Sequence, residues 1–349
     1  MTGRPIRTNI SPTDGPAEAD GPPEGGHDAR SDEAGPSVRA LVEPLSIDEF
    51  VAAHWRRRHL FSSGEAGRFA GLLSWPAFNR ILEHHWREPH RFRLSRKGRD
   101  LEPASYADLT GSTPRILSKA LTDHLRAGAT LAFHAIDEVH EPLTRLAECV
   151  EAFFEADVQI NAYAGWRATH GLDVHHDDEE IFILQVDGRK HWRLFGSDAQ
   201  AVVFDRILCA GDGLYIPRGC DHLAIPVNEP TLHLAVGVRN PGAGVKERPI
   251  FGLPWSATAE GLPGGRHFRV ALSGSARVTG ADASAIDIRC RNRTYRFPRS
   301  MRLVIERLAE ETSVPMSHLL DALSGQLDED DVRLLLAMLA QAGLVAIIL

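Results

Sequence analysis

The sequence predicts an α+β protein built around an antiparallel double-sheet barrel of the jelly-roll type (a double-stranded β-helix), with a helical N-terminal flank and a C-terminal winged-helix-like module. Two observations predict this class. Between residues 157 and 240, short β-rich segments are separated by tight turns such as Asp187-Gly188, without long helices between them. On both sides of this stretch, apolar residues recur at helical spacing.

Composition and periodicity divide the 349-residue chain into segments. The first residues are rich in Gly, Pro, Ser and acids, a composition that buries too little apolar surface to offset chain entropy. The predicted segments are a disordered tail (1–36), a helical part (37–156), the barrel core (157–240), a linker with helical or irregular structure (241–288) and the winged-helix-like module (289–349).

Local signals place the elements within these segments. Ser46 and Glu49 form a capping box at the start of the first predicted helix. Within the barrel, the segments 181–186 and 190–195 flank the Asp187-Gly188 turn, which predicts a β-hairpin. A further predicted helix begins near Ser74, and others cover about 117–127, 141–155, 299–311, 314–324 and 328–342; the remaining predicted strands are 129–134, 157–165, 215–216, 232–238 and 345–349.

Charge and cysteine content restrict the class of function. The formal net charge of -8 disfavours a polyanionic partner such as nucleic acid, because that affinity needs clustered Lys and Arg. The four cysteines lack CxxC spacing, and no apolar run approaches the roughly 20 residues that cross a bilayer. The N-terminus also lacks the apolar stretch of a signal peptide. We therefore expect a cytoplasmic protein with reduced thiols and no membrane contact.

The C-terminal module raises the question of DNA binding, because three helices and a final strand resemble a winged helix. Residues 289–349 contain eight Arg and eight acidic residues, a net charge of zero. This balance favours a role in packing or homodimerisation.

The stretch from Val174 to Phe182 carries the strongest chemical signal. Side chains alternate along a strand, so His175 and Asp177 are expected to point into one cavity. His222 lies 45 residues after Asp177 (222 minus 177), at the predicted end of another strand, and is the third candidate ligand. Two imidazoles and one carboxylate on one face of an octahedral ion predict an iron(II) site with three positions free for a chelating 2-oxo acid and dioxygen. Zinc fits this set poorly, because it prefers four-coordinate sites.

A 2-oxo acid with a second carboxylate also needs a cation, and Lys190 lies on the strand after the Asp187-Gly188 turn. Asn161 and Tyr163, two residues apart on a strand, are expected to face the same interior as hydrogen-bond donors. The competing interpretation of each signal is structural. An isolated HxD pair is a common surface feature, and Lys190 lies within a charged Arg-Lys-His run.

Taken together, these motifs resemble the core of the JmjC (cupin-like) ribosomal oxygenases. The resemblance covers about 80 residues: Asn161-Ala162-Tyr163, the segment 175–178, the segment 182–192, and the segment 211–219 followed by His222. The chain departs from the family pattern at His176, where an aromatic residue often follows the first ligand. It departs again between Gly165 and Asp173, where the usual small-residue run is absent and His170 occurs.

The resemblance implies an iron(II) and 2-oxoglutarate-dependent dioxygenase, with iron on His175, Asp177 and His222. It also implies that Lys190 holds 2-oxoglutarate, aided by Asn161 and Tyr163. The expected reaction is hydroxylation of a side chain in a protein or peptide, such as His or Arg of a ribosomal protein or a residue of a ribosomally made peptide. The alternatives are an N-methyl-lysine demethylase of the same chemistry, a DNA-binding regulator with an inactive cupin sensor, and a purely structural cupin.

Overall fold

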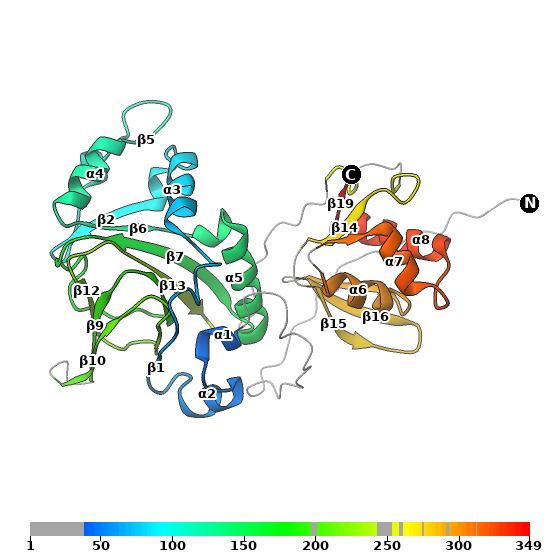
Figure 1. The fold of residues 1–349 in the computed structure, drawn as a ribbon, viewed down its shortest axis with the longest axis horizontal. Coiled ribbons are helices and arrows are strands. Elements are labelled where there is room, and N and C mark those ends of the chain that lie inside the picture. Colours follow the sequence, from blue (N-terminus) through cyan, green and yellow to red (C-terminus); the bar gives the residue numbers. More distant parts are fainter. Residues whose placement is uncertain are drawn as a thin grey trace, which may run out of the picture. The chain divides into compact units, whose positions relative to one another are not determined.

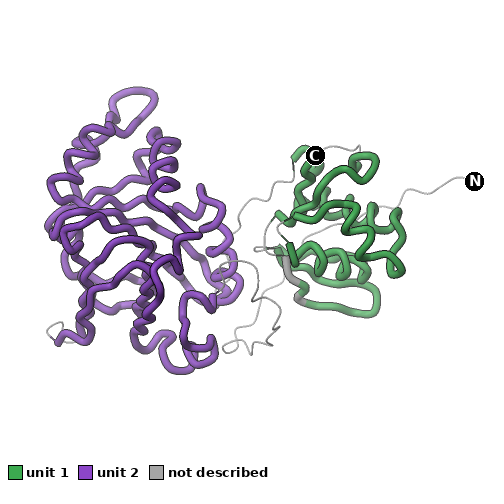
Figure 2. Tube along the Cα trace, viewed as in Figure 1, with its two compact units in different colours: residues 1–34, 244–349 green, residues 35–243 purple. Residues whose placement is uncertain are grey.

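The computed structural model of the chain describes residues 38–196, 201–242, 253–257, 261–273, 276–290, 293–311 and 313–349. The predicted tail (1–36) and part of the predicted linker lie outside these residues. The chain divides into two compact units, one formed by residues 35–243 and the other containing the chain from residue 244 onward (Figure 2). Each unit is described by itself.

A large antiparallel sheet forms the centre of the first unit (Figure 1). Its central strands are buried on both faces, because a second sheet covers one face and helices cover the other. Adjacent strands pair antiparallel throughout. In spatial order the strands are β1 (Leu60–Ser62), β11 (Gly213–Ile216), β8 (Glu180–Asp187), β13 (Thr231–Arg239), β7 (Asp157–Gly165), β6 (Thr130–Phe133), β2 (Phe92–Arg96) and β3 (Arg99–Asp100).

A smaller sheet completes the barrel. It consists of β10 (Val202–Leu208), β9 (Lys190–Phe195) and β12 (His222–Pro226), again antiparallel. Side chains from both sheets form one apolar cluster, in which Ile183 of the large sheet joins Trp192 and Leu194 of the small one. Two antiparallel sheets packed face to face around a shared core, with helices outside, confirm the predicted α+β jelly-roll fold.

The predicted β-hairpin at Asp187-Gly188 is wrong. Strand β8 pairs with β11 and β13 in the large sheet, whereas β9 pairs with β10 and β12 in the small one, so the turn carries the chain from one sheet to the other. Gly188 has a φ of 64°, and a Cβ atom there would lie 2.0 Å from the carbonyl oxygen of Pro230. Because β8 already has a neighbour on each edge, no place remains beside it for β9.

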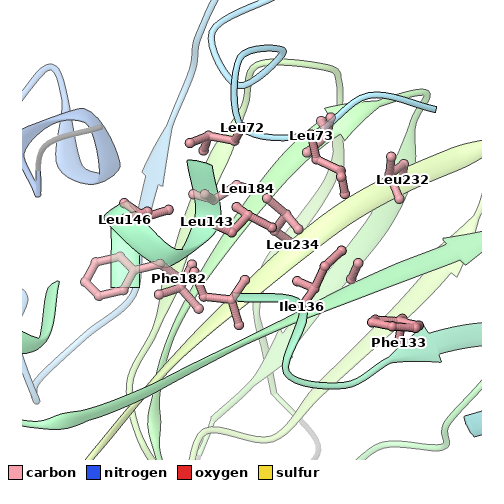
Figure 3. Packing of buried hydrophobic residues seen from close by; sticks show 14 of the residues in the cluster. Leu72, Leu73, Phe133, Ile136, Leu143, Leu146, Phe182, Leu184, Leu232 and Leu234 are labelled. Carbon is pink, nitrogen blue, oxygen red and sulfur yellow. The ribbon is translucent and has the colours of Figure 1, made fainter. Parts of the chain in front are cut away.

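Helices cover the outer face of the large sheet. The last of them, α5 (Glu141–Phe154), places Leu143 and Leu146 against Leu184 and Leu234 (Figure 3). The predicted capping box at Ser46 is present, with hydrogen bonds in both directions between Ser46 and Glu49. The other helices of this unit are α1 (Arg39–Val42), α2 (Ile47–Ala53), α3 (Trp75–His84) and α4 (Ser118–Arg126), with the short turns η1 (Pro89–Arg91), η2 (Pro103–Ser105) and η3 (Ile136–Glu138) and the strand pair β4 (Ala107–Asp108) and β5 (Arg115–Ile116).

The second unit contains the three predicted helices and the predicted final strand. These are α6 (Met301–Ala309), α7 (Met316–Leu323), α8 (Glu329–Gln341), capped by Asp328, and β19 (Val345–Ile348). Strands also occur within residues 241–288, which the composition predicted to be a linker. In this stretch, short β segments alternate with Gly, Ser and charged residues. The remaining strands of the unit are β14 (Arg269–Leu272), β15 (Ala276–Ala281), β16 (Ala285–Cys290), β17 (Arg293–Pro298) and β18 (Val314–Pro315).

None of the helices in the described part of the chain combines the length and the apolar character that crossing a bilayer requires.

Candidate metal centre

Backbone pairing brings His175 and His222 together. Their amides and carbonyls exchange two hydrogen bonds, of 3.2 and 2.8 Å, and form an isolated β-bridge. The two imidazole rings therefore lie side by side, with centroids 4.4 Å apart. The sequence placed His175 on a strand and His222 at the end of one. In the structure His175 lies in an extended segment before β8, and His222 is the first residue of β12.

Asp177 completes a compact set of donor atoms. Its Oδ2 lies 3.9 Å from Nε2 of His175 and 3.5 Å from Nε2 of His222. All three side chains offer atoms within 4.8 Å of one another. Two atoms that each bind one ion at roughly 2.0–2.2 Å can lie at most about 4.0–4.4 Å apart. The two histidine–aspartate distances meet this limit, so each histidine can share a divalent ion with Asp177.

Hydrogen bonds fix the tautomer of both histidines. Nδ1 of His175 lies 2.8 Å from the carbonyl of Asp173, and Nδ1 of His222 lies 3.0 Å from the carbonyl of Cys220. A carbonyl oxygen only accepts, so each Nδ1 donates and each Nε2 keeps a free lone pair directed toward Asp177. Such hydrogen bonds to the second ring nitrogen are typical of metal-binding histidines, because they hold the ring in place.

Burial keeps His222 neutral, as a metal ligand must be. The pKa of His222 is lowered, chiefly because burial disfavours the charged ring and also because His175 lies next to it. The neighbouring candidates have partners of their own. His176 contacts the carboxylate of Asp221 at 3.1 Å, and His170 contacts that of Asp173 at 3.0 Å.

Lys190 faces the interior between the two sheets. Its side chain is buried, and its ammonium nitrogen lies 5.7 Å from the ring centre of Trp192. No hydrogen bond or ion pair of this nitrogen occurs within the described residues. Burial alone lowers the pKa of Lys190 from 10.5 to about 7. An amine that loses this much basicity lacks a compensating negative charge nearby.

The two predicted polar residues of β7 differ in their surroundings. Tyr163 is half-buried, and its pKa is raised to about 12, first by burial and then by the charge of Asp177. Tyr163 therefore lies near the candidate metal ligands. In contrast, Oδ1 of Asn161 accepts hydrogen bonds from the amide of Ala135 at 3.0 Å and from Nε2 of Gln159 at 2.8 Å. The carbonyl of Asn161 is thus used within the fold.

One interior residue was missed by the sequence reasoning. His233 of β13 pairs directly opposite Tyr163 in the large sheet, and the two rings stack with centroids 4.9 Å apart and an interplanar angle of 8°. The edge of the His233 ring also meets Trp192 of the small sheet, at 5.4 Å and 88°. The alternating burial of β7 hints at an inward face, but the register that places His233 beside Tyr163 is not visible in the sequence.

Comparisons with known proteins identify the domain. A JmjC domain model matches residues 134–244. Ribosomal oxygenase 1 of Gallus gallus is 29% identical over 209 residues, which cover 53% of this chain and 33% of that protein. The bifunctional lysine-specific demethylase and histidyl-hydroxylase NO66 of Drosophila grimshawi is 26% identical over 224 residues, 57% of this chain and 30% of that protein. The chain thus spans about a third of the length of these relatives.

Among solved structures, the ribosomal oxygenase YcfD of Escherichia coli in complex with cobalt and 2-oxoglutarate is similar over 87% of this chain and 98% of that one, with a TM-score of 0.53 and 17% identity. At this identity the similarity concerns the fold. The domain match, the sequence relatives and the fold agree with one another. Residues 134–244 match the JmjC domain, and the chain is similar to the ribosomal oxygenases.

Proposed function

We propose that the protein is an iron(II) and 2-oxoglutarate-dependent dioxygenase that hydroxylates a side chain of a protein or peptide. One observation carries this proposal. A two-histidine, one-carboxylate donor set lies at one end of an interior that also holds Lys190, a buried cation without a counter-charge in the described residues. A dianionic co-substrate that chelates a metal at one end and offers a carboxylate at the other would satisfy both features.

The proposed roles follow from the geometry of the side chains. His175, Asp177 and His222 would hold the iron through Nε2, a carboxylate oxygen and Nε2. When bound, iron would supply the dioxygen chemistry that couples decarboxylation of 2-oxoglutarate to oxidation of a C–H bond. Lys190 would bind the distal carboxylate, because burial makes its charge costly until an anion meets it.

Other side chains would keep the reaction dry and oriented. Trp192 is buried beside both Lys190 and His222, so its indole would exclude water from the path between them. Tyr163 would contribute its hydroxyl near Asp177. We retain Asn161, which shares a side-chain hydrogen bond with Tyr163, as a candidate co-substrate contact.

A protein side chain is the proposed substrate. The relatives support it, because one is named a ribosomal oxygenase and another a lysine-specific demethylase and histidyl-hydroxylase. Ribosomal proteins and ribosomally made peptides of the host are the first candidates. Intact-mass measurement should find one added oxygen on the substrate. Released formaldehyde would instead identify the alternative, removal of an N-methyl group from lysine.

For the C-terminal unit we propose a packing or dimerisation role. Two of its arginines are engaged with acids: Arg296 with Asp282 and Asp287, and Arg307 with Glu310 and Glu311. Paired arginines offer little free charge for phosphates. A dimer by light scattering, with no salt-dependent binding of duplex DNA, is the expected result. Strong DNA binding would revive the alternative of a regulator with an inactive sensor domain.

The enzymatic proposal is tested by anaerobic titration with iron(II) and 2-oxoglutarate, followed by oxygen exposure with candidate peptides. We expect one iron per chain and succinate formation that depends on oxygen. His175→Ala should abolish both. His176→Ala is the matched control, because its side chain is 58% exposed and directed toward Asp221. Succinate formation that persists in His175→Ala would refute the assignment.

A further inference from the structure

The interior between the two sheets contains polar atoms that the fold leaves unpaired. Nδ1 of His233 and Nε1 of Trp192 are buried and have no hydrogen-bond partner in the described part of the chain. Lys190, which is 5% exposed, likewise makes no hydrogen bond or ion pair within these residues. A buried polar group without a partner destabilises a protein, so these groups in one place indicate a missing partner.

These groups converge from opposite walls of the barrel. Lys190 and Trp192 lie on β9 of the small sheet, and His233 lies on β13 of the large sheet. The indole of Trp192 contacts both of the others, with 5.7 Å to the Lys190 nitrogen and 5.4 Å to the His233 ring. The charge of Lys190 also lowers the pKa of His233. The unpaired groups therefore form one cluster.

The ring of His233 is held in a fixed orientation. Tyr163 stacks on one face almost in parallel, and Trp192 meets the ring nearly at a right angle. His233 is 2% exposed. Contacts of this kind leave the imidazole little freedom to rotate, so its nitrogen atoms are presented in constant directions.

We propose that His233 is a second contact to the distal carboxylate of the co-substrate, so that Lys190 and His233 bind this group from the two sheets. The inference rests on the proposed function and adds a specificity-determining residue to it. A carboxylate only accepts hydrogen bonds and has room for several donors, so one such group satisfies both Lys190 and His233 in the tautomer that carries its proton on Nδ1.

Lys190 and His233 contribute differently to carboxylate binding, because only Lys190 carries a charge. Burial and the neighbouring Lys190 keep the pKa of His233 well below its ordinary value, so the ring stays neutral. Lys190 then supplies the single positive charge that matches the distal carboxylate, and neutral His233 supplies direction. A 2-oxo acid that lacks the distal carboxylate leaves both donors unpaired and should bind more weakly.

The fold itself offers an alternative hydrogen-bond partner for His233. Gln185 lies opposite His233 in the strand register, and its Oε1 is also buried without a partner. If His233 serves only the fold by donating to Gln185, its removal should lower stability without changing the preference for a diacid. The experiment must therefore compare two ligands rather than measure one affinity.

The test uses the full-length protein loaded with manganese(II), with binding measured by calorimetry for 2-oxoglutarate and for 2-oxobutyrate, which lacks the second carboxylate. His233→Leu should weaken 2-oxoglutarate about tenfold to a hundredfold, the usual range for one hydrogen bond to a charged group, and leave 2-oxobutyrate unchanged. His233→Asn, whose amide nitrogen lies near the position of Nδ1, should restore part of the affinity. His233→Gln should not.

The outcomes separate the two proposals. If the wild-type protein binds no 2-oxoglutarate, the proposed function itself fails. If the wild type binds and Lys190→Met weakens binding while His233→Leu does not, only the role of His233 is overturned. An equal loss for both ligands would also overturn it, because it would indicate general disruption. Should His233→Leu fail to bind manganese, the Asn and Gln variants decide the matter.

Discussion

The carboxylate of Asp177 lies 3.5 Å from Nε2 of His222, although the two residues are separated by two strands of the large sheet and two of the small one. Asp177 and His222 lie close together because His222, the first residue of β12, pairs through its backbone with His175. Asp177→Asn keeps the shape of the side chain but removes its charge. We expect manganese(II) affinity to fall by at least tenfold, measured by electron paramagnetic resonance. Asp178→Asn is the control, since that side chain is 91% exposed.

The pKa of Lys190 predicts how co-substrate binding depends on pH. Without ligand this pKa is about 7, so above that pH the amine is mostly neutral and must take up a proton when a carboxylate binds. Affinity for 2-oxoglutarate should therefore fall by up to about tenfold per pH unit above 7. Calorimetry in buffers of different ionisation enthalpy should detect the uptake, and Lys190→Met should abolish it. Uptake that persists in the variant would assign the proton to another group.

The same shift predicts the stability of the ligand-free protein. The unfolded chain holds the proton of Lys190 up to its ordinary pKa of 10.5, whereas the folded chain releases it near 7. Folding is thus penalised below pH 7, and the penalty is relieved as the pH rises from about 7 toward 10.5. Urea unfolding at several pH values should show a smaller pH dependence for Lys190→Met over this range. Identical pH profiles for the two proteins would contradict the assignment.

Gly188 should tolerate no side chain. Gly188→Ala places a methyl group 2.0 Å from the carbonyl oxygen of Pro230 and forces a non-glycine residue to a φ of 64°. We expect a loss of roughly 1–3 kcal/mol in urea unfolding. Gly242→Ala is the matched control, because Gly242 also has a positive φ, 84°, but nothing lies within 4 Å of its added Cβ. Equal losses in the two variants would show that backbone strain, rather than the contact with Pro230, sets the effect.

Tyr215 joins the N-terminal helices to the barrel. Its hydroxyl donates to the buried carboxylate of Glu180 and accepts from the amide of Arg56 at 2.8 Å. Tyr215→Phe leaves both groups short of a partner, so unfolding free energy should fall by about 1–3 kcal/mol. Tyr295→Phe, whose hydroxyl makes no hydrogen bond in the described part of the chain, should change it by less than about 0.5 kcal/mol. A neutral Tyr215→Phe would mean that water replaces the lost partner.

Much of the architecture could be predicted because local signals and tertiary contacts agree. The capping box at Ser46 and the cap at Asp328 each satisfy backbone amides at a helix start, a requirement that holds in any fold. The hairpin at Asp187-Gly188 could not be judged in this way. A short turn fixes where a strand ends, but strand partners depend on which edges are free, and β8 has none.

In the candidate site, too, some residues could be predicted from local sequence signals and others could not. The spacing of His175, Asp177 and His222 predicted them as metal ligands. A metal binds particular donor types, and such a combination of donors is rare in a sequence. Lys190 stood out as a charge within a strand. His233 remained hidden, because an isolated histidine in an apolar strand has no local signature, and only the register with Tyr163 reveals its neighbours.

The chain passes from the large sheet to the small one at Gly188, and this passage restricts the insertions that the sequence can accept there. Only Gly188 and Arg189 separate the last residue of β8 from Lys190, and side chains along β9 alternate between interior and solvent. One residue inserted here would reverse that alternation, turning Lys190 and Trp192 outward and His191 and Arg193 inward. Loop length at this point is therefore under as strict a constraint as the identity of the lysine.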